Sequence, residues 1–240
     1  MSPRVGVLLS GCGVYDGSEI QEAVLTLLAL DRRGVEALVC APDVVQKDVI
    51  DHRTGEVDPG EIRNVLEEAA RISRGHIRDV ALVRSEEIDG LILPGGFGVS
   101  KNLSDFATKG AECIVHPEAA RLVRAVHEHG KPIAALCIAP VVLARVLGAE
   151  APILTIGDHP ATADALEAMG ATHVRCPATE VVVDRELKLV TSPAYMLARR
   201  IGEVSESVEN AVSELLKLAP APRPEGAVTR GAASPSGRPE

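Results

Sequence analysis

The chain has 240 residues, 46% of them apolar, and a formal charge of −9 from 25 basic and 34 acidic side chains. This length allows one large domain or two small ones, and we expect one compact unit. Binding to nucleic acid requires a basic surface, which this composition does not offer. Aromatic residues make up only 2% of the chain, which excludes a platform for stacking bases.

The cysteines indicate a reducing compartment. Their number is odd, they are widely spaced, and no two form a C-x-x-C pair: they are Cys12, Cys40, Cys113, Cys137 and Cys176. This pattern argues against a disulfide framework and against a structural zinc site. No signal-peptide pattern follows Met1, and no apolar stretch is long enough to span a membrane. We therefore expect a cytoplasmic protein that binds neither metal nor membrane.

Short apolar runs alternate with helical patterns over residues 1–219. Strands are predicted at 5–9, 35–41, 91–93, 132–136 and near 173–176, and helices at about 18–33, 60–74, 117–129, 138–147, 160–169 and 195–218. Strands that are apolar throughout are typical of a mostly parallel sheet with helices on both faces. Two further strands, 181–184 and 187–191, are joined by Arg185-Glu186 and predict a small β-hairpin before the last helix.

The C-terminal segment has a different composition. Residues 220–240 hold five of the 16 prolines and contain no Ile, Leu or aromatic residue. Such a segment cannot bury enough apolar surface to offset its ordering entropy. We therefore predict a single α/β domain over 1–219, followed by a disordered tail rich in Pro, Gly and Ala.

The segment around Cys137 resembles a nucleophile elbow. A buried strand ends at this thiol, a helix follows at once, and small residues flank it in the pattern Ala135-x-Cys137-x-Ala139. A tight elbow accepts only small flanking side chains, and Pro140 suits the first turn of the helix. The helix N-terminus should lower the thiol pKa. A lone cysteine in an apolar run is otherwise a small buried hydrophobe, but the strand end, the alanines and the proline favour a nucleophile.

A second turn, Pro94-Gly95-Gly96-Phe97-Gly98, also follows a buried strand. Glycines let the backbone approach a ligand and turn N–H groups toward it, as an oxyanion hole requires. An ordinary strand-to-helix turn explains the same residues equally well.

The first turn, Ser10 to Gly17, has two functional interpretations. Its glycines and Asp43 loosely match a dinucleotide fingerprint, so nucleotide binding is one hypothesis. Alternatively, the turn places Glu19 and Glu22 on one face of the first helix, for which Ser18 and Gln21 form a capping box. Both acids suit the helix dipole as solvated residues. If one of them is buried, its raised pKa lets it donate a hydrogen bond to the Cys137 thiolate.

The histidines are scattered. His173 in a late strand and His159 before a helix are the two that we expect over the strand ends, although single histidines are more often structural. Cys12 in the first turn is expected near the site as a neighbour or redox partner. The remaining three cysteines are interpreted as buried.

Several long segments resemble the ElbB/ES1 family, the enhancing lycopene biosynthesis proteins, within the PfpI-type, class I glutamine amidotransferase-like superfamily. They include GVLLSGCGVYDGSEIQEAVLTLLAL, LILPGGFGVSKNLSDFA, CIAPVVLA and TSPAYMLA. The resemblance extends over residues 3–218. It implies a flavodoxin-like α/β sandwich, a homodimer, and a cofactor-free glyoxalase that converts glyoxal to glycolate, with deglycase activity as an addition.

The resemblance also assigns roles. It implies that Cys137 is the nucleophile, that Glu22 contacts it, and that the backbone of Gly95 or Gly96 with Ile138 forms the oxyanion pocket. The sequence departs from PfpI-type proteases because Ile138 stands where they carry histidine after the cysteine. It also lacks the His-x-Glu pair that amidotransferases carry late in the domain. Proteolysis and glutamine hydrolysis are therefore not expected.

The leading hypothesis is a glutathione-independent glyoxalase that acts on glyoxal or methylglyoxal through a Cys137 hemithioacetal. Glu22 or His173 would transfer the proton, and no metal or cofactor is required. The alternative is a redox-responsive binding or regulatory protein with an oxidisable Cys137 and little turnover.

Overall fold

The computed structural model describes residues 3–219, so the predicted tail lies outside the described residues. Seven strands form one sheet in the order β10-β11-β7-β6-β1-β2-β5. They are β1 (Arg4–Leu8), β2 (Glu36–Ala41), β5 (Arg78–Asp79), β6 (Gly90–Leu93), β7 (Ile133–Leu136), β10 (Val182–Asp184) and β11 (Leu189–Ser192). Neighbours are parallel except β10 and β11, which form the antiparallel hairpin that the sequence predicts.

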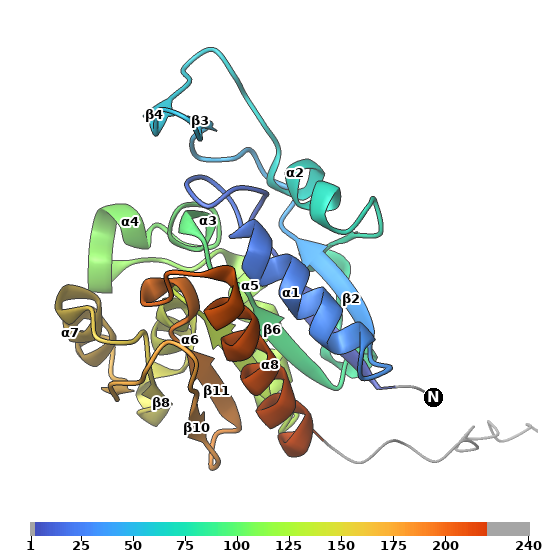
Figure 1. Ribbon diagram of the computed structural model, residues 1–240, viewed down its shortest axis with the longest axis vertical. Helices are drawn as coiled ribbons and strands as arrows, with labels where there is room; N and C mark the ends of the chain where they lie inside the picture. The colour runs from blue at the N-terminus through green and yellow to red at the C-terminus, as the bar shows by residue number, and fades with distance from the viewer. Residues whose placement is uncertain (1–2, 220–240) are drawn as a thin grey trace, which may run out of the picture.

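Helices cover both faces of this sheet (Figure 1). They are α1 (Ile20–Asp31), α2 (Val65–Ile72), α3 (Phe97–Lys101), α4 (Phe106–Lys109), α5 (Pro117–Glu128), α6 (Pro140–Leu147), α7 (Pro160–Ala168) and α8 (Ile201–Leu218). One apolar core packs α1, α2 and α8 against the sheet, and the other packs α5, α6 and α7 against the opposite face. The predicted α/β sandwich is confirmed. Within residues 3–219, none of the helices has the length and apolar character needed to cross a membrane.

Several helices begin later than the sequence predicts, and the largest difference is at α8, which begins at Ile201 rather than near residue 195. The starts of α1 and α2 differ because other residues cap them. Glu19 caps α1, while the Ser18 hydroxyl accepts a hydrogen bond from the Ser10 N–H at 2.8 Å instead. Asn64 caps α2 through the N–H groups of Leu66 and Glu67. A cap residue adopts extended backbone and so sets the first helical residue.

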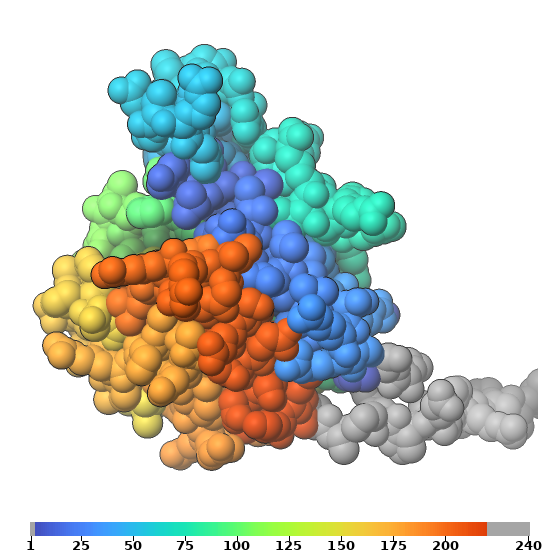
Figure 2. All heavy atoms as spheres, in the orientation of Figure 1, coloured from blue at the N-terminus to red at the C-terminus, as the bar shows by residue number. Residues whose placement is uncertain are grey.

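An arm that the sequence does not predict projects from the body beside α2 (Figures 1 and 2). It carries the hairpin of β3 (Ile50–Asp51) and β4 (Glu56–Val57), whose strands are too short to show a periodic pattern. Asp16 anchors the arm by accepting a hydrogen bond from the Ile50 N–H at 2.8 Å. A second small sheet pairs β8 (Ile153–Leu154) with β9 (Thr172–His173).

The sheet order brings four turns to one edge. Strands β11, β7, β6 and β1 are consecutive neighbours and run parallel, so their carboxyl ends meet. The turns that leave them contain Tyr195, Cys137, Gly95-Gly96 and the first turn, Ser10 to Gly17. This edge is where open α/β sheets bind ligands.

Candidate active site

Cys137 occupies a strained turn between β7 and α6. Its φ of +57° lies in the left-handed region, which costs a residue other than glycine about 1–2 kcal/mol. The conformation is fixed by the Cys137 N–H, which donates to the Ser192 carbonyl at 2.9 Å, and by the full burial of Ala135 and Ala139 on either side. Strain of this kind collects at functional sites, where it aims a side chain. The local geometry is that of the elbow expected from the sequence.

Glu22 reaches the same point from the first turn of α1, and it is fully buried. One carboxyl oxygen accepts a hydrogen bond from the Gly95 N–H at 2.8 Å, and the other accepts from the Tyr195 N–H at 3.2 Å. The carboxyl also forms a hydrogen bond with the Cys137 side chain. Burial raises the pKa of Glu22 to about 7, and the nearby Glu19 carboxylate adds to this rise. Glu22 can therefore hold or release a proton near neutral pH.

Two backbone N–H groups face the Cys137 sulfur, those of Gly96 and Ile138. Their approach depends on glycine. A Cβ on Gly95 would lie 2.4 Å from the Cys137 Cβ and 2.8 Å from a Glu22 oxygen, and a Cβ on Gly96 would lie 2.3 Å from the Glu19 nitrogen. No side chain fits at either position. The pair supplies fixed donors to negative charge that develops at or beside the sulfur.

The thiol pKa differs from the sequence prediction. Burial, and after it the Glu22 carboxylate, raise the pKa of Cys137, while the Gly96 and Ile138 N–H groups oppose the rise. Cys137 also lies before the helix and not in its first turn, because α6 begins at Pro140 with Ala139 as its cap. When Glu22 is protonated, its repulsion of the thiolate is removed. The two groups therefore titrate as a coupled pair that shares one proton.

The structure does not bring His173 to the site. His173 lies in β9 of the second small sheet, where its Nε2 accepts a hydrogen bond from the Ile156 N–H at 3.5 Å. Burial lowers the pKa of His173, and the charges that act on it most are Glu167 and Arg175. His159 caps α7. Within residues 3–219, no histidine side chain is among the groups that most strongly shift the pKa of Cys137.

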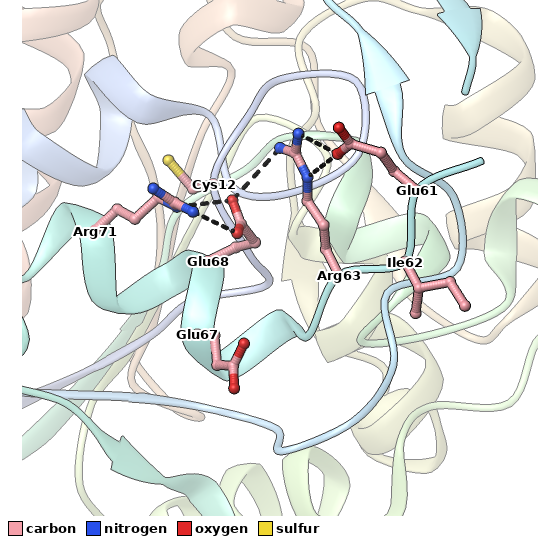
Figure 3. A pocket seen from close by; sticks show the side chains of 7 residues that line it. All are labelled: Cys12, Glu61, Ile62, Arg63, Glu67, Glu68 and Arg71. Atoms are coloured by element: carbon pink, nitrogen blue, oxygen red, sulfur yellow. Dashed lines mark hydrogen bonds and ion pairs between the residues drawn. The ribbon is translucent and has the colours of Figure 1, made fainter. Parts of the chain in front are cut away.

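Cys12 is also separate from the Cys137 site, because it lines a cavity that does not include Cys137 (Figure 3). This cavity has a volume of about 560 Å³ and lies between the first turn, α2 and the base of the arm; its lining is Cys12, Glu61, Ile62, Arg63, Glu67, Glu68 and Arg71. Burial and the Glu68 carboxylate raise the pKa of the Cys12 thiol. The other three cysteines are buried, as expected, and no disulfide joins any of the five, all of which lie in the described chain.

The nucleotide interpretation of the first turn finds no support in the structure. A phosphate site needs an open helix N-terminus. Here the Glu19 side chain accepts from the Glu22 N–H at 2.6 Å, and the Glu19 N–H donates to the Gly95 carbonyl at 2.9 Å. Asp43, the expected ribose partner, accepts a hydrogen bond from the Asn64 side chain at 2.7 Å.

Residues 14–200 match the model of the DJ-1/PfpI family. The chain belongs to the DJ-1/PfpI family. It is 44% identical over 225 residues to the human glutamine amidotransferase-like class 1 domain-containing protein 3, mitochondrial, covering 90% of this chain and 83% of that protein. It is 43% identical over 225 residues to the rat ES1 protein homolog, mitochondrial, covering 90% and 84%.

Two solved structures have a similar fold. An isoprenoid biosynthesis protein with an amidotransferase-like domain from Ehrlichia chaffeensis superimposes with a TM-score of 0.83 at 38% identity, over 89% of this chain and 99% of that one. Glyoxalase III from Candida albicans superimposes with a TM-score of 0.58 at 11% identity, over 91% and 98%, and shares the fold alone.

The relatives correct the expected location. Both curated relatives are named mitochondrial proteins, so the prediction of a cytoplasmic protein is wrong. The cysteine pattern on which that prediction rested excludes oxidising compartments but does not distinguish one reducing compartment from another.

Proposed function

We propose that this protein is a glutathione-independent glyoxalase of the ElbB/ES1 type, which converts glyoxal, or methylglyoxal, to the hydroxy acid. The observation that carries the proposal is the hydrogen bond between Glu22 and Cys137, together with the Gly96 and Ile138 N–H groups that face the same sulfur. A glyoxalase-type role also agrees with the DJ-1/PfpI family, whose fold glyoxalase III shares.

The first step is addition of the Cys137 sulfur to one aldehyde carbon of glyoxal. The C–S bond forms, the carbonyl π electrons move to oxygen, and the Gly96 and Ile138 N–H groups stabilise the oxyanion. The proton of the Glu22–Cys137 pair then neutralises this oxygen, which gives the hemithioacetal. The reaction needs the pair in its singly protonated state, with either residue carrying the proton.

The second step moves a proton between the two carbons. The Glu22 carboxylate removes a proton from the carbon attached to sulfur, which gives an enediolate. The hydroxyl proton on that carbon's oxygen passes to the neighbouring oxygen, and Glu22 returns its proton to the neighbouring carbon. One carbon is oxidised and the other reduced, so no external electron carrier takes part. The product is a thioester of Cys137, which water hydrolyses to glycolate, and the thiol is regenerated.

The polarity of the site suits an uncharged dicarbonyl substrate. The strongest influences on the Cys137 sulfur are burial, one carboxyl group and two backbone N–H groups, and no basic side chain is among them. A substrate that carries a carboxylate or phosphate would be buried there without a counter-ion, at a large cost. Small neutral aldehydes avoid this penalty.

The test is glyoxal turnover without glutathione. We expect Cys137→Ala to reduce glycolate formation at least about 1000-fold, because the covalent intermediate cannot form. Cys176→Ala is the matched control, since Cys176 is a buried thiol on another part of the chain. Glycolate formation by Cys137→Ala at the parent rate would refute the proposal.

The same geometry supports a second candidate, a redox-responsive regulatory protein. A protonated Glu22 and the two N–H groups would also hydrogen-bond the oxygens of an oxidised Cys137. This alternative is favoured if glyoxal turnover stays near background while mild peroxide converts Cys137 to the sulfinic acid.

A further inference from the structure

Glu19 is the N-cap residue of α1, and the hydrogen bonds at this helix start differ from those of an ordinary capping box. In a capping box, the side chain of the third helical residue bonds back to the N–H of the cap residue. The cap of α1 is Glu19 and the third residue is Glu22. Here the box is half formed: the Glu19 carboxylate accepts from the Glu22 N–H at 2.6 Å, whereas the Glu22 carboxyl turns away to Gly95, Tyr195 and Cys137.

The reason that Glu22 is free to turn away lies in the Glu19 backbone. Its N–H, the group that Glu22 would otherwise bond, donates to the Gly95 carbonyl at 2.9 Å. This contact also orients the oxyanion donor. The Gly95 carbonyl and the Gly96 N–H belong to one peptide group, and in a trans peptide they point in opposite directions. Holding the carbonyl on Glu19 therefore aims the N–H at the Cys137 sulfur, as observed.

We propose that Glu19 is a positioning residue of this site: its backbone ties the start of α1 to the Gly95–Gly96 peptide, and its side chain holds a buried carboxylate beside Glu22. The inference rests on the proposed function for its consequence in turnover, but the arrangement itself is a property of the folded chain. Glu19 does not touch the Cys137 sulfur in any described contact, so it acts through Glu22 and the peptide.

The Glu19 side chain also acts through its charge. It is almost fully buried, which raises the pKa of Glu19, and the backbone N–H groups of Glu22 and Gln21 oppose that rise. After burial, the charge of Glu19 is the largest cause of the raised pKa of Glu22. The titratable groups that face Glu22 are Glu19 on the same helix, Cys137 after β7, and Tyr195 after β11. Of these three groups, only Glu19 is among the charges that raise the pKa of Glu22.

The experiment measures how fast iodoacetamide alkylates Cys137 between pH 5 and pH 9, with the Cys137 peptide quantified by mass spectrometry. The parent rate should rise through a midpoint near 7, where Glu22 loses its proton. Glu19→Gln keeps an oxygen that accepts the Glu22 N–H but removes the charge, so Glu22 should lose its proton at lower pH. We expect the midpoint to fall by about one pH unit.

Two variants separate charge from other effects. Glu19→Asp keeps both the charge and the capping oxygen, so its midpoint should stay with the parent. Glu118→Gln removes an acid from the first turn of α5 that is not among the main influences on Glu22 or Cys137, and it changes the net charge of the protein by the same amount. Superimposed profiles for Glu19→Gln and the parent would overturn the proposal, and so would an equal shift in Glu118→Gln.

A measurement on the parent covers the case in which Glu19→Gln does not fold. In a ¹³C carboxyl NMR titration, Glu19 must lose its proton at lower pH than Glu22, and the opposite order overturns the proposal. Alkylation does not require turnover, so the two proposals fail separately. A shifted midpoint in a protein that makes no glycolate removes the glyoxalase function and leaves the role of Glu19 intact.

Discussion

Cys137 and Cys12 both follow buried parallel strands at the same edge of the sheet, yet their surroundings differ. The Cys137 sulfur is buried beside one carboxyl group, Glu22, and two backbone N–H groups. The Cys12 thiol is half-buried in a cavity whose lining is mostly charged side chains. Both cysteines therefore lie at the edge of the sheet where ligands bind, but the groups around their sulfur atoms differ.

The two sites differ most in the partners of the carboxyl group beside each cysteine, Glu68 at Cys12 and Glu22 at Cys137. At the Cys12 cavity, Glu68 is held by Arg71 in two hydrogen bonds of 3.0 Å and faces Arg63 at 3.6 Å. At Cys137, Glu22 has no basic partner in residues 3–219 and accepts only from backbone N–H groups and the thiol. A carboxylate that is paired with arginine keeps its negative charge, whereas an isolated buried one takes up a proton near neutral pH. Only the second kind can shuttle a proton.

The largest expected effect comes from filling the space beside Glu22 and Cys137. Gly95→Ala would place a Cβ 2.4 Å from the Cys137 Cβ and 2.8 Å from a Glu22 oxygen, so the carboxyl and the thiol must separate. We expect glyoxal turnover to fall below detection and the free energy of unfolding to drop by about 1–3 kcal/mol. Urea unfolding and a glycolate assay measure the two effects.

Gly202→Ala is the control for this change, because the Gly202 position in α8 opens onto free space. It should leave turnover unchanged. Parent-like turnover in Gly95→Ala would show that the contact between Glu22 and Cys137 is not needed, and it would remove the main contrast with Cys12.

An intermediate effect is expected on the pH dependence of the two thiols. In the parent, alkylation of Cys137 should rise through a midpoint near 7, set by Glu22. In Glu22→Gln this rise should disappear, because the glutamine has no proton to lose, and turnover should slow. Alkylation of Cys12 should follow only its own raised thiol pKa in both proteins. Peptide mass spectrometry reports both sites in one sample, and a rise near pH 7 that persists in Glu22→Gln would assign it to another group.

The parts of the site that sequence analysis predicts are local. The elbow pattern around Cys137 and the glycines after β6 are contiguous motifs, and their geometry in the structure is the one that those motifs require. The parallel sheet follows from the alternation of apolar strands and helices, and it is confirmed. Spacing alone leaves Glu19 and Glu22 as alternatives, because it does not show which carboxyl faces the sheet edge, and only the family resemblance selects Glu22.

The remaining parts depend on the strand order. The Tyr195 N–H donates to Glu22 although the two residues are 173 positions apart in the sequence, because β11 lies next to β7 in the sheet. In the sequence, only the family resemblance of the segment TSPAYMLA points to this turn. The Glu19 contact with Gly95 is a backbone contact, which no side-chain pattern reveals. His173 was expected over the strand ends, but its strand belongs to the second small sheet.

The smallest expected effect concerns the charged network at Cys12. Glu68→Gln removes the charge that Arg63 and Arg71 share but keeps an oxygen that can accept one hydrogen bond. Because both arginines are largely solvated, we expect the thermal midpoint to fall by only about 2 °C. The Cys12 thiol should ionise at lower pH, since Glu68 no longer repels the thiolate. The alkylation profile of Cys137 should stay that of the parent, because Glu68 is not among the main influences on its sulfur. A shifted Cys137 profile in Glu68→Gln would show that the two turns are coupled and that their separation in the structure does not make them independent.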